Sequence, residues 1–177
     1  MQTVLKHTLN RRIDCVDIDD ALLLRIRQLL GREPRGMLGV YISAETGSPA
    51  VVEVSCLVDQ KPFPTLYWLI EPSICYRLDQ LEASGVIAQL QAEVDRSDDM
   101  RRAMAADHAW YRAQRKRQTP EADLRQLTEL GFASTLEEKG IGGISKLDRV
   151  RCLHTWYASH LVEPNAVGSW LDENTEF

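Results

Sequence analysis

The sequence has few cysteines and lacks a long hydrophobic run. Its four cysteines, Cys15, Cys56, Cys75 and Cys152, are scattered without a Cys-x-x-Cys spacing, which is typical of free thiols in a reducing compartment. No apolar run approaches the roughly 18 residues that a bilayer-crossing helix needs. The first residues also lack the charged and apolar regions of a signal peptide. We therefore expect a cytoplasmic protein with no membrane partner.

An excess of positive charge is also missing. The chain has 21 Lys and Arg against 26 Asp and Glu, a formal net charge of −5, which argues against a surface devoted wholly to nucleic acid. Its 177 residues, of which 44% are hydrophobic and 27% charged, are typical of one globular domain. A chain of this length can bury a core without help from a metal or a disulfide, so we expect no cofactor.

The first part of the chain predicts one helix and a small sheet. Apolar residues at helical spacing indicate a short helix from Ala21 to Leu30, capped by Asp19 or Asp20 and stopped by Gly31. Three later segments, rich in β-branched and aromatic residues and separated by turns, predict antiparallel strands at residues 37–43, 51–58 and 65–70.

The rest of the chain predicts only helices. Pro72 opens a pair of helices joined at Gly85, and Ser97 or Asp98 caps a third that ends near Arg117. Two more helices are expected, from Pro120 to Leu130 and from Ser145 to about Val162, with a loop at residues 132–144 between them. The expected fold is one α+β domain over residues 1–177, in which a three-stranded meander packs against a helical C-terminal half.

The segment 140–160 holds the densest set of reactive side chains. In a helix beginning at Ser145, His154 would face the interior one turn after Arg151, below a glycine-rich loop. Free amides, the helix dipole and basic side chains all favour a bound anion. The candidate ligand-binding residues are Arg151, Arg149, Lys146, Gly142, Gly143 and Ser145, with His154 as a candidate acid or base. The alternatives are a glycine turn with no ligand, a core histidine, and a solvated pair between Arg149 and Asp148.

A metal site in this segment is disfavoured by helical geometry. Thiolate and imidazole are zinc ligands, which makes Cys152, His154 and His160 candidates. In a continuous helix the first two differ by about 200° around the axis and the last two by about 240°, so the three side chains diverge. We therefore predict no metal here, and Cys152 as a small core residue.

A second histidine, His108, lies in a helical turn with Asp107 and Tyr111. An imidazole beside a carboxylate and a phenol suits proton transfer, so His108 is a further catalytic candidate. The alternative is packing, because His108 shares its helical stripe with Met100 and Met104.

The helix at residues 101–117 is strongly basic. It carries six basic residues against Asp107 alone, namely Arg101, Arg102, Arg112, Arg115, Lys116 and Arg117. Such a helix could follow a phosphate backbone, although most charge runs on helices are solvated faces.

Several segments together resemble a known bacterial family, the domain of unknown function 501. They are Arg35-Gly36, residues 47–53 (GSPAVVE), 62–69 (PFPTLYWL), 81–85 (LEASG), His108 with Tyr111, 148–154 (DRVRCLH) and 165–168 (NAVG), in the family's order over about residues 32–172. Residues 1–31 would then be an N-terminal extension. The resemblance implies no established activity. It implies that a site would be formed by the Pro-Phe-Pro-Thr turn (residues 62–65), His108, residues 148–154 and the loop 165–168. Gene neighbours of some relatives, which encode an exopolyphosphatase, mildly favour a phosphate-bearing ligand.

The resemblance also bears on metals. Many relatives have a Cys-x-Cys-Gly element between the first two strands, where this chain has Ala44 and Thr46 before Gly47. A thiolate-rich metal site at that turn is therefore not expected in this protein.

Two functions follow from these patterns. The first is the binding of a phosphorylated or otherwise anionic small molecule near the C-terminal helix, with His154 or His108 as acid or base if chemistry occurs. The alternative is a non-enzymatic interaction module that meets a protein or RNA partner through helix 101–117 or the exposed aromatics Trp110, Trp156 and Trp170. Whether the protein is an enzyme stays open at this stage.

Overall fold

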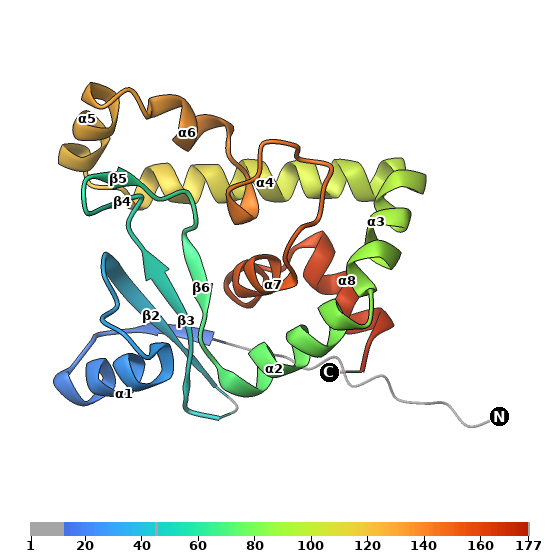
Figure 1. Cartoon of the computed structure of the whole chain (residues 1–177), viewed down its shortest axis with the longest axis horizontal. Coiled ribbons are helices and arrows are strands. Elements are labelled where there is room, and N and C mark those ends of the chain that lie inside the picture. The colour runs from blue at the N-terminus through green and yellow to red at the C-terminus, as the bar shows by residue number, and fades with distance from the viewer. Residues whose placement is uncertain (1–12, 45, 177) are drawn as a thin grey trace.

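A computed structural model describes residues 13–44 and 46–176. Within them the α+β class predicted from the sequence is confirmed: a small antiparallel sheet lies beside a mostly helical C-terminal half (Figure 1). No helix in the described residues is long and apolar enough to cross a membrane.

The sheet has four strands in the described chain, one more than predicted. Their spatial order is β1 (Ile13–Val16), β2 (Met37–Ser43), β3 (Pro49–Val54) and β6 (Tyr67–Leu69), all antiparallel. Strand β1 has only four residues, too few to show a periodicity, and it forms by pairing along β2.

The predicted strand 51–58 divides into two. Strand β3 ends at Val54, after which β4 (Leu57–Val58) and β5 (Lys61–Pro62) form a separate hairpin. Its turn residues Asp59 and Gln60 have φ of 50° and 59°, the left-handed conformation that a two-residue hairpin requires.

The sheet is covered on both faces. All of β3 is buried because Val51 faces the helical core and Val52 faces the opposite side, where α1 (Asp20–Leu30) packs through Ile26. Asp19 caps α1, as predicted, by accepting the Leu22 N–H at 2.7 Å.

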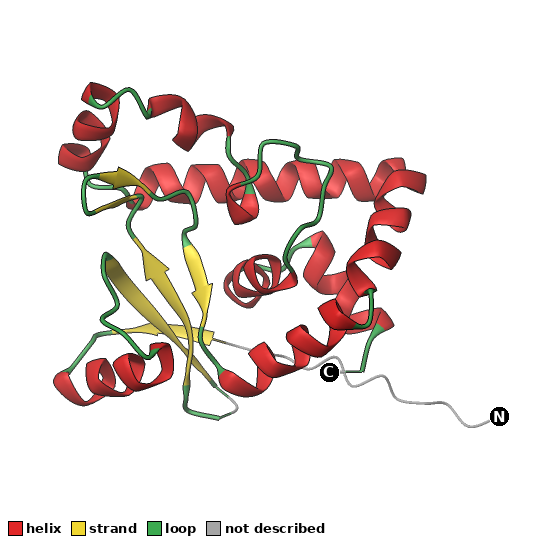
Figure 2. Ribbon diagram, in the orientation of Figure 1, coloured by secondary structure: helices red, strands yellow, loops and turns green. Residues whose placement is uncertain are grey.

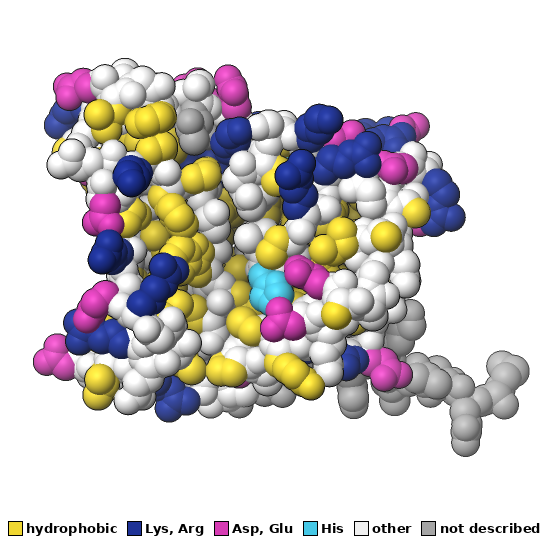
Figure 3. All heavy atoms as spheres, in the orientation of Figure 1, with side chains coloured by type: hydrophobic (Ala, Val, Ile, Leu, Met, Phe, Trp, Pro, Cys, Tyr) yellow, Lys and Arg dark blue, Asp and Glu magenta, His cyan; other side chains and the backbone are white. Residues whose placement is uncertain are grey.

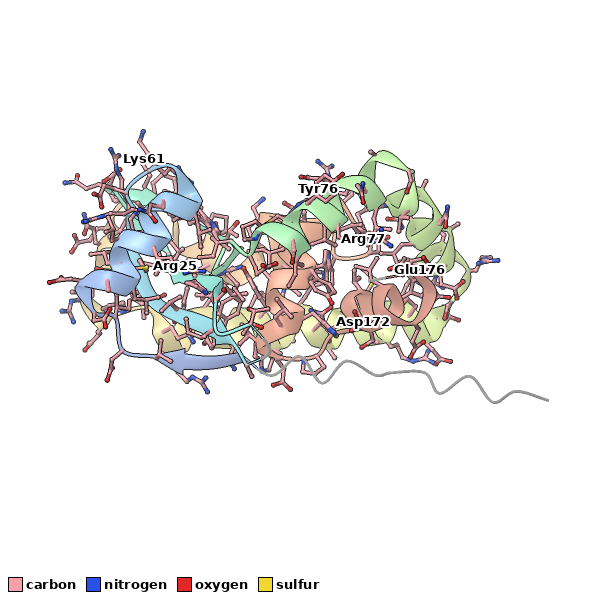
Figure 4. All side chains as sticks on the ribbon, turned by 90° about the horizontal axis from the view of Figure 1, so that it is seen from below. Arg25, Lys61, Tyr76, Arg77, Asp172 and Glu176 are labelled. Atoms are coloured by element: carbon pink, nitrogen blue, oxygen red, sulfur yellow. The ribbon has the colours of Figure 1, made fainter. Side chains whose placement is uncertain are left out.

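The helical half surrounds one buried helix, α7 (Leu153–Val162), which Figure 1 shows nearly end-on between the sheet and the other helices. The surrounding helices are α2 (Pro72–Ala83), α3 (Val86–Arg96), α4 (Asp98–Gln118) and α8 (Ala166–Asn174). Seen from below, Arg77 of α2 and Glu176 lie together, and Arg77 donates to the Glu176 carbonyl (Figure 4). The C-terminal end of the chain is thereby attached to α2.

Three helix predictions in the last third were wrong or incomplete. Helix α5 (Glu121–Glu129) is as expected, but the expected loop 132–144 contains α6 (Ala133–Glu138) and a 3-10 turn, η1 (Ile141–Gly143). Helix α8 was not predicted, and it begins where Asn165 accepts the Gly168 N–H at 2.8 Å.

The third wrong prediction concerns the start of α7 and matters most for function. This helix begins at Leu153 and not at Ser145. The preceding stretch is an irregular loop (Figure 2). Gln91 of α3 holds this loop by accepting the Val150 N–H and donating to the Asp148 carbonyl, both at 3.0 Å. These tertiary hydrogen bonds replace the helical ones that the local sequence favours.

Candidate functional site

His154 lies in the first turn of α7, next to side chains from α2. Its Nδ1 is 3.2 Å from Glu82 Oε1 and 3.9 Å from Cys152 Sγ. On the other edge of the ring, Nε2 is 3.2 Å from the Cys75 carbonyl and 3.3 Å from Asp79 Oδ1. The side chain of His154 is 24% exposed, so a solute can reach it.

The cluster raises the pKa of His154 to about 9. The contact with the Cys152 sulfur is the largest contribution and the Glu82 carboxylate adds to it, whereas partial burial acts in the opposite direction. In the metal-free protein the ring therefore carries a proton on each nitrogen at neutral pH, facing acceptors on both edges.

Cys152 joins this cluster because it precedes the helix. It is the N-cap of α7 and has an extended backbone, with φ −148° and ψ 121°. The predicted divergence of Cys152 and His154 assumed that both lie within one helix, and that assumption is wrong. The donor atoms of Glu82, Cys152 and His154 all lie within 4.8 Å of one another.

His160, the third candidate ligand that the sequence offered, lies elsewhere in the fold. Its Nε2 is 3.1 Å from Asp172 Oδ2 and its Nδ1 accepts the Asn165 N–H at 3.0 Å, at the corner between α7 and α8. His160 therefore has a structural role in joining these two helices.

The predicted anion cradle does not form as expected. Gly142 and Gly143 belong to η1 and do not directly precede α7, which begins at Leu153, and the Gly143 N–H already donates to the Gly140 carbonyl at 3.0 Å. Both have positive φ, near 70°, and a Cβ on Gly142 would lie 2.8 Å from Thr155 Oγ1. These glycines thus allow η1 to approach α7 closely.

The N-terminus of α7 is capped by a carboxylate of the protein and not by a bound anion. Glu82 Oε1 accepts the Leu153 N–H at 2.6 Å. A carboxylate from α2 therefore occupies the position that we had predicted for a bound anion.

Within the described residues, none of the predicted basic side chains makes a hydrogen bond or ion pair with His154. Arg149 lies 3.6 Å from Asp95 and 3.9 Å from Asp148. These contacts agree with the alternative interpretation, a solvent-exposed ion pair between Arg149 and Asp148. Lys146 is exposed, and Ser145 accepts from Lys139. Arg151 is exposed between the more buried Val150 and Cys152.

His108 is a buried core residue. Its Nδ1 accepts the Ile141 N–H and its Nε2 bonds the Leu147 carbonyl, both at 3.0 Å, while the ring packs against Trp156. Burial lowers the pKa of His108 to about 4. A neutral ring with both nitrogens bonded to backbone has no free position for proton transfer, so the structure favours packing over catalysis.

The basic helix α4 has fewer free charges than its sequence suggests. Arg101 pairs with Asp98, Arg102 with Asp99, and Arg117 donates to Gln114. Arg115 is 1% exposed and donates to the carbonyls of Leu136 and Lys139 at 3.0 and 2.8 Å. Of the six basic residues of α4, only Arg112 and Lys116 make no hydrogen bond or ion pair with another described residue.

The aromatic residues proposed for a partner surface are not strongly exposed. Trp156 is buried in α7, and Trp110 and Trp170 are half-buried against the main core. They therefore contribute to packing, and the prediction of exposed tryptophans was wrong.

A shallow hollow of about 280 Å³ borders His154 on the side of the sheet. It is lined by Thr65, Tyr67, Trp68, Leu69, His154 and Thr155. On the face shown in Figure 3, hydrophobic side chains line a depression, with a histidine and acidic side chains at its edge. The hollow offers room for a small ligand beside the cluster.

Sequence reasoning missed the two acidic residues from α2. Glu82 is more than 60 residues from Cys152 along the chain, so no local spacing could connect them. The available signal was indirect: Glu82 lies in the LEASG segment that supports the family resemblance.

The fold and the site define an α+β protein with a half-buried cluster of carboxylate, thiol and imidazole at the N-terminus of a central helix. A comparison with protein families matches residues 41–173 to the family described as "Protein of unknown function (DUF501)". The chain belongs to this family, as the sequence motifs predicted. No curated protein and no solved structure matches the chain.

Proposed function

We propose that this protein holds one divalent metal ion of the zinc class between Glu82, Cys152 and His154, and that the ion binds a small anionic ligand. The observation that carries the proposal is the approach of the three donor atoms to within 4.8 Å of one another. Thiolate, imidazole and carboxylate are the ligands that zinc takes from proteins.

Two of the three donor distances can be compared with those around a tetrahedral ion. Ligand atoms bound to zinc at about 2.0–2.3 Å lie roughly 3.3–3.6 Å from one another in tetrahedral geometry. Nδ1 of His154 is 3.2 Å from Glu82 Oε1 and 3.9 Å from Cys152 Sγ. Cys152 Sγ would have to approach Nδ1 by a few tenths of an ångström, and its distance to the Glu82 carboxylate is within 4.8 Å.

The surroundings of His154 support ligation through Nδ1. Nε2 faces the Cys75 carbonyl and Asp79 Oδ1, both acceptors, so the N–H belongs on that nitrogen. Metal-bound histidines commonly donate their other ring N–H to a carbonyl or a carboxylate, which orients the ring. The charges also balance, because a divalent ion offsets the Cys152 thiolate and the Glu82 carboxylate.

Three protein ligands leave a fourth position open, as in catalytic rather than structural zinc sites. An ion with an open position binds an anionic oxygen and polarises the group that carries it. The anionic ligand expected from the sequence is retained here, with the metal in place of the arginines and the glycine loop as the source of positive charge. The hollow beside His154 supplies space for the rest of that ligand.

We also infer a cytoplasmic location. Cys56, Cys75 and Cys152 are free thiols, and unpaired thiols are typical of proteins in a reducing compartment. Cell fractionation with an antibody to the native protein tests this inference, and recovery outside the cytoplasm would contradict it.

The metal test uses tag-free, full-length protein loaded with Zn²⁺ and then desalted. We expect about one equivalent of zinc, and a thiolate-to-cobalt charge-transfer band when Co²⁺ is used instead. Cys152→Ser should abolish the band, and Glu82→Gln and His154→Gln should weaken metal retention by about 10-fold or more. Cys75→Ser is the matched control, because Cys75 reaches His154 through its backbone carbonyl.

The outcome separates the two parts of the proposal. Folded wild-type protein that retains no zinc, or a Cys152→Ser variant that retains as much as wild type, refutes the metal site. If the cobalt site forms but its spectrum does not respond to inorganic phosphate or to an organic phosphate ester, the ligand class is wrong.

A further inference from the structure

A second concave site lies at the other end of the helical half, between α4, α5 and α6. Figure 1 shows α5 and α6 lying along the C-terminal part of α4. The groove between them has a volume of about 420 Å³ and is lined by Arg112, Ala113, Lys116, Leu124, Thr128, Ala133, Leu136 and Glu137. We call it the α4–α6 groove.

The walls of the α4–α6 groove are mainly apolar. Leu124 and Leu136 belong to a small hydrophobic cluster with the buried Leu127 and Cys56, separate from the main core. Ala113 and Ala133 have short side chains, which leaves the space between the helices open. A volume of this size is within the roughly 300–1,000 Å³ typical of small-molecule sites.

The two basic residues of the groove lining, Arg112 and Lys116, are the two basic residues of α4 for which the described residues supply no partner. Arg101, Arg102 and Arg117 pair with acidic or amide groups and Arg115 is buried against carbonyls. Arg112 and Lys116 make no hydrogen bond or ion pair within the described part of the chain. They are four residues apart, so they lie on the same face of α4, where like charges repel. An anion bound between them would relieve this repulsion.

We propose that the α4–α6 groove binds a small amphiphilic anion, with a carboxylate or phosphate head group between Arg112 and Lys116 and an aliphatic chain against Leu124 and Leu136. The charge complementarity of the two unpaired cations selects the head group, and the apolar walls select the chain. Among the described lining residues, Glu137 is the one acidic side chain, so Arg112 and Lys116 leave this lining with a net positive charge. This site uses none of the residues of the proposed metal centre.

The test is calorimetric titration of full-length, metal-free protein with decanoate and decyl phosphate, below their micelle-forming concentrations. Decanol supplies the chain without the charge, and inorganic phosphate supplies the charge without the chain. We expect both amphiphiles to bind and each partial probe to bind at least about 10-fold more weakly, since a charged hydrogen bond contributes about 1.5–3 kcal/mol.

Two kinds of variant assign the binding to the groove. Arg112→Ala and Lys116→Ala should each weaken decanoate binding about 10-fold, while Arg102→Ala, on the same helix but paired with Asp99, should leave it unchanged. Ala113→Leu fills the groove without changing its charge and should block binding.

Binding should persist in Cys152→Ser, which separates this site from the metal centre. The proposal is overturned if neither amphiphile binds, if decanol binds as tightly as decanoate, or if Arg112→Ala and Lys116→Ala bind like wild type. It is also overturned if only vesicles of anionic lipid, and no soluble amphiphile, bind the protein.

Discussion

The Glu82 carboxylate accepts the backbone N–H of Leu153 at 2.6 Å, which ties the end of α2 to the first residue of α7. The same oxygen lies 3.2 Å from His154 Nδ1. One side chain thus sets where the central helix begins and how its histidine is oriented. This contact explains why the site forms only in the folded chain.

Removing the Glu82 carboxylate should destabilise the protein. Glu82→Ala leaves the Leu153 N–H without its acceptor and removes the partner of His154, so we expect a loss of about 2 kcal/mol in the free energy of unfolding. Urea denaturation measures this loss. Glu82→Gln, which keeps an oxygen acceptor, should lose about half as much; equal losses for the two variants would show that the hydrogen bond to Leu153 is not the stabilising contact.

Gly140 should not tolerate a side chain. A Cβ at this position would lie 2.4 Å from Nδ1 of the buried His108, so Gly140→Ala should displace the ring and cost about 2–3 kcal/mol. Its φ of −85° suits any residue, so the cost arises from packing alone. At Gly131, a Cβ has open space but φ is 78°, and Gly131→Ala should cost only about 1 kcal/mol of backbone strain. Thermal unfolding of the two variants should show this order, and the reverse order would contradict the packing at His108.

The buried His108 should make stability depend on pH. Burial lowers the pKa of His108 from 6.5 to about 4. At a pH between these two values, the unfolded chain therefore binds a proton at His108 that the folded protein does not bind. The contribution of His108 to the free energy of unfolding is therefore fully present above pH 6.5 and is lost as the pH falls towards 4. The loss amounts to up to about 3 kcal/mol.

The variant His108→Gln isolates this contribution, because it removes the titrating group. The difference in unfolding free energy between wild type and variant should shrink as the pH is lowered through the same window. A constant difference would mean that His108 is protonated equally in the folded and unfolded states.

Arg115 should be more important for stability than the other basic residues of α4. It is buried and donates to the carbonyls of Leu136 and Lys139, so it holds the segment after α5 against α4. Arg115→Met should leave these carbonyls unsatisfied and cost about 3 kcal/mol. Arg112→Met, on the same helix, should change stability by less than about 0.5 kcal/mol. Chemical denaturation compares the two, and similar costs would contradict the structural role of Arg115.

Much of the fold could be predicted because its signals are local. The cap at Asp19, the strand at residues 37–43, the break at Gly85 and the cap at Ser97 are each read from a few neighbouring residues, and the structure confirms them. The helix expected from Ser145 failed because distant residues intervene. Gln91 and Glu82 bond the backbone of residues 148–153 and delay the start of α7.

The candidate site was predicted only in part for the same reason. His154 and Cys152 stand out in the sequence, and the family membership points to their segment. The carboxylate that completes the cluster belongs to α2, and the argument against a metal depended on a helix that begins too late to contain Cys152.

The sequence by itself determined the α+β class, the family and most of the helices and strands, because hydrophobic periodicity, caps and turn residues act over a few positions. Only the tertiary structure decided which reactive residues meet. It placed His108 in the core, moved His160 to the corner of α7 and α8, and brought Glu82 to Cys152 and His154. The physical reason is that contacts between distant segments depend on packing and on which buried backbone groups need partners, neither of which is encoded in local spacing.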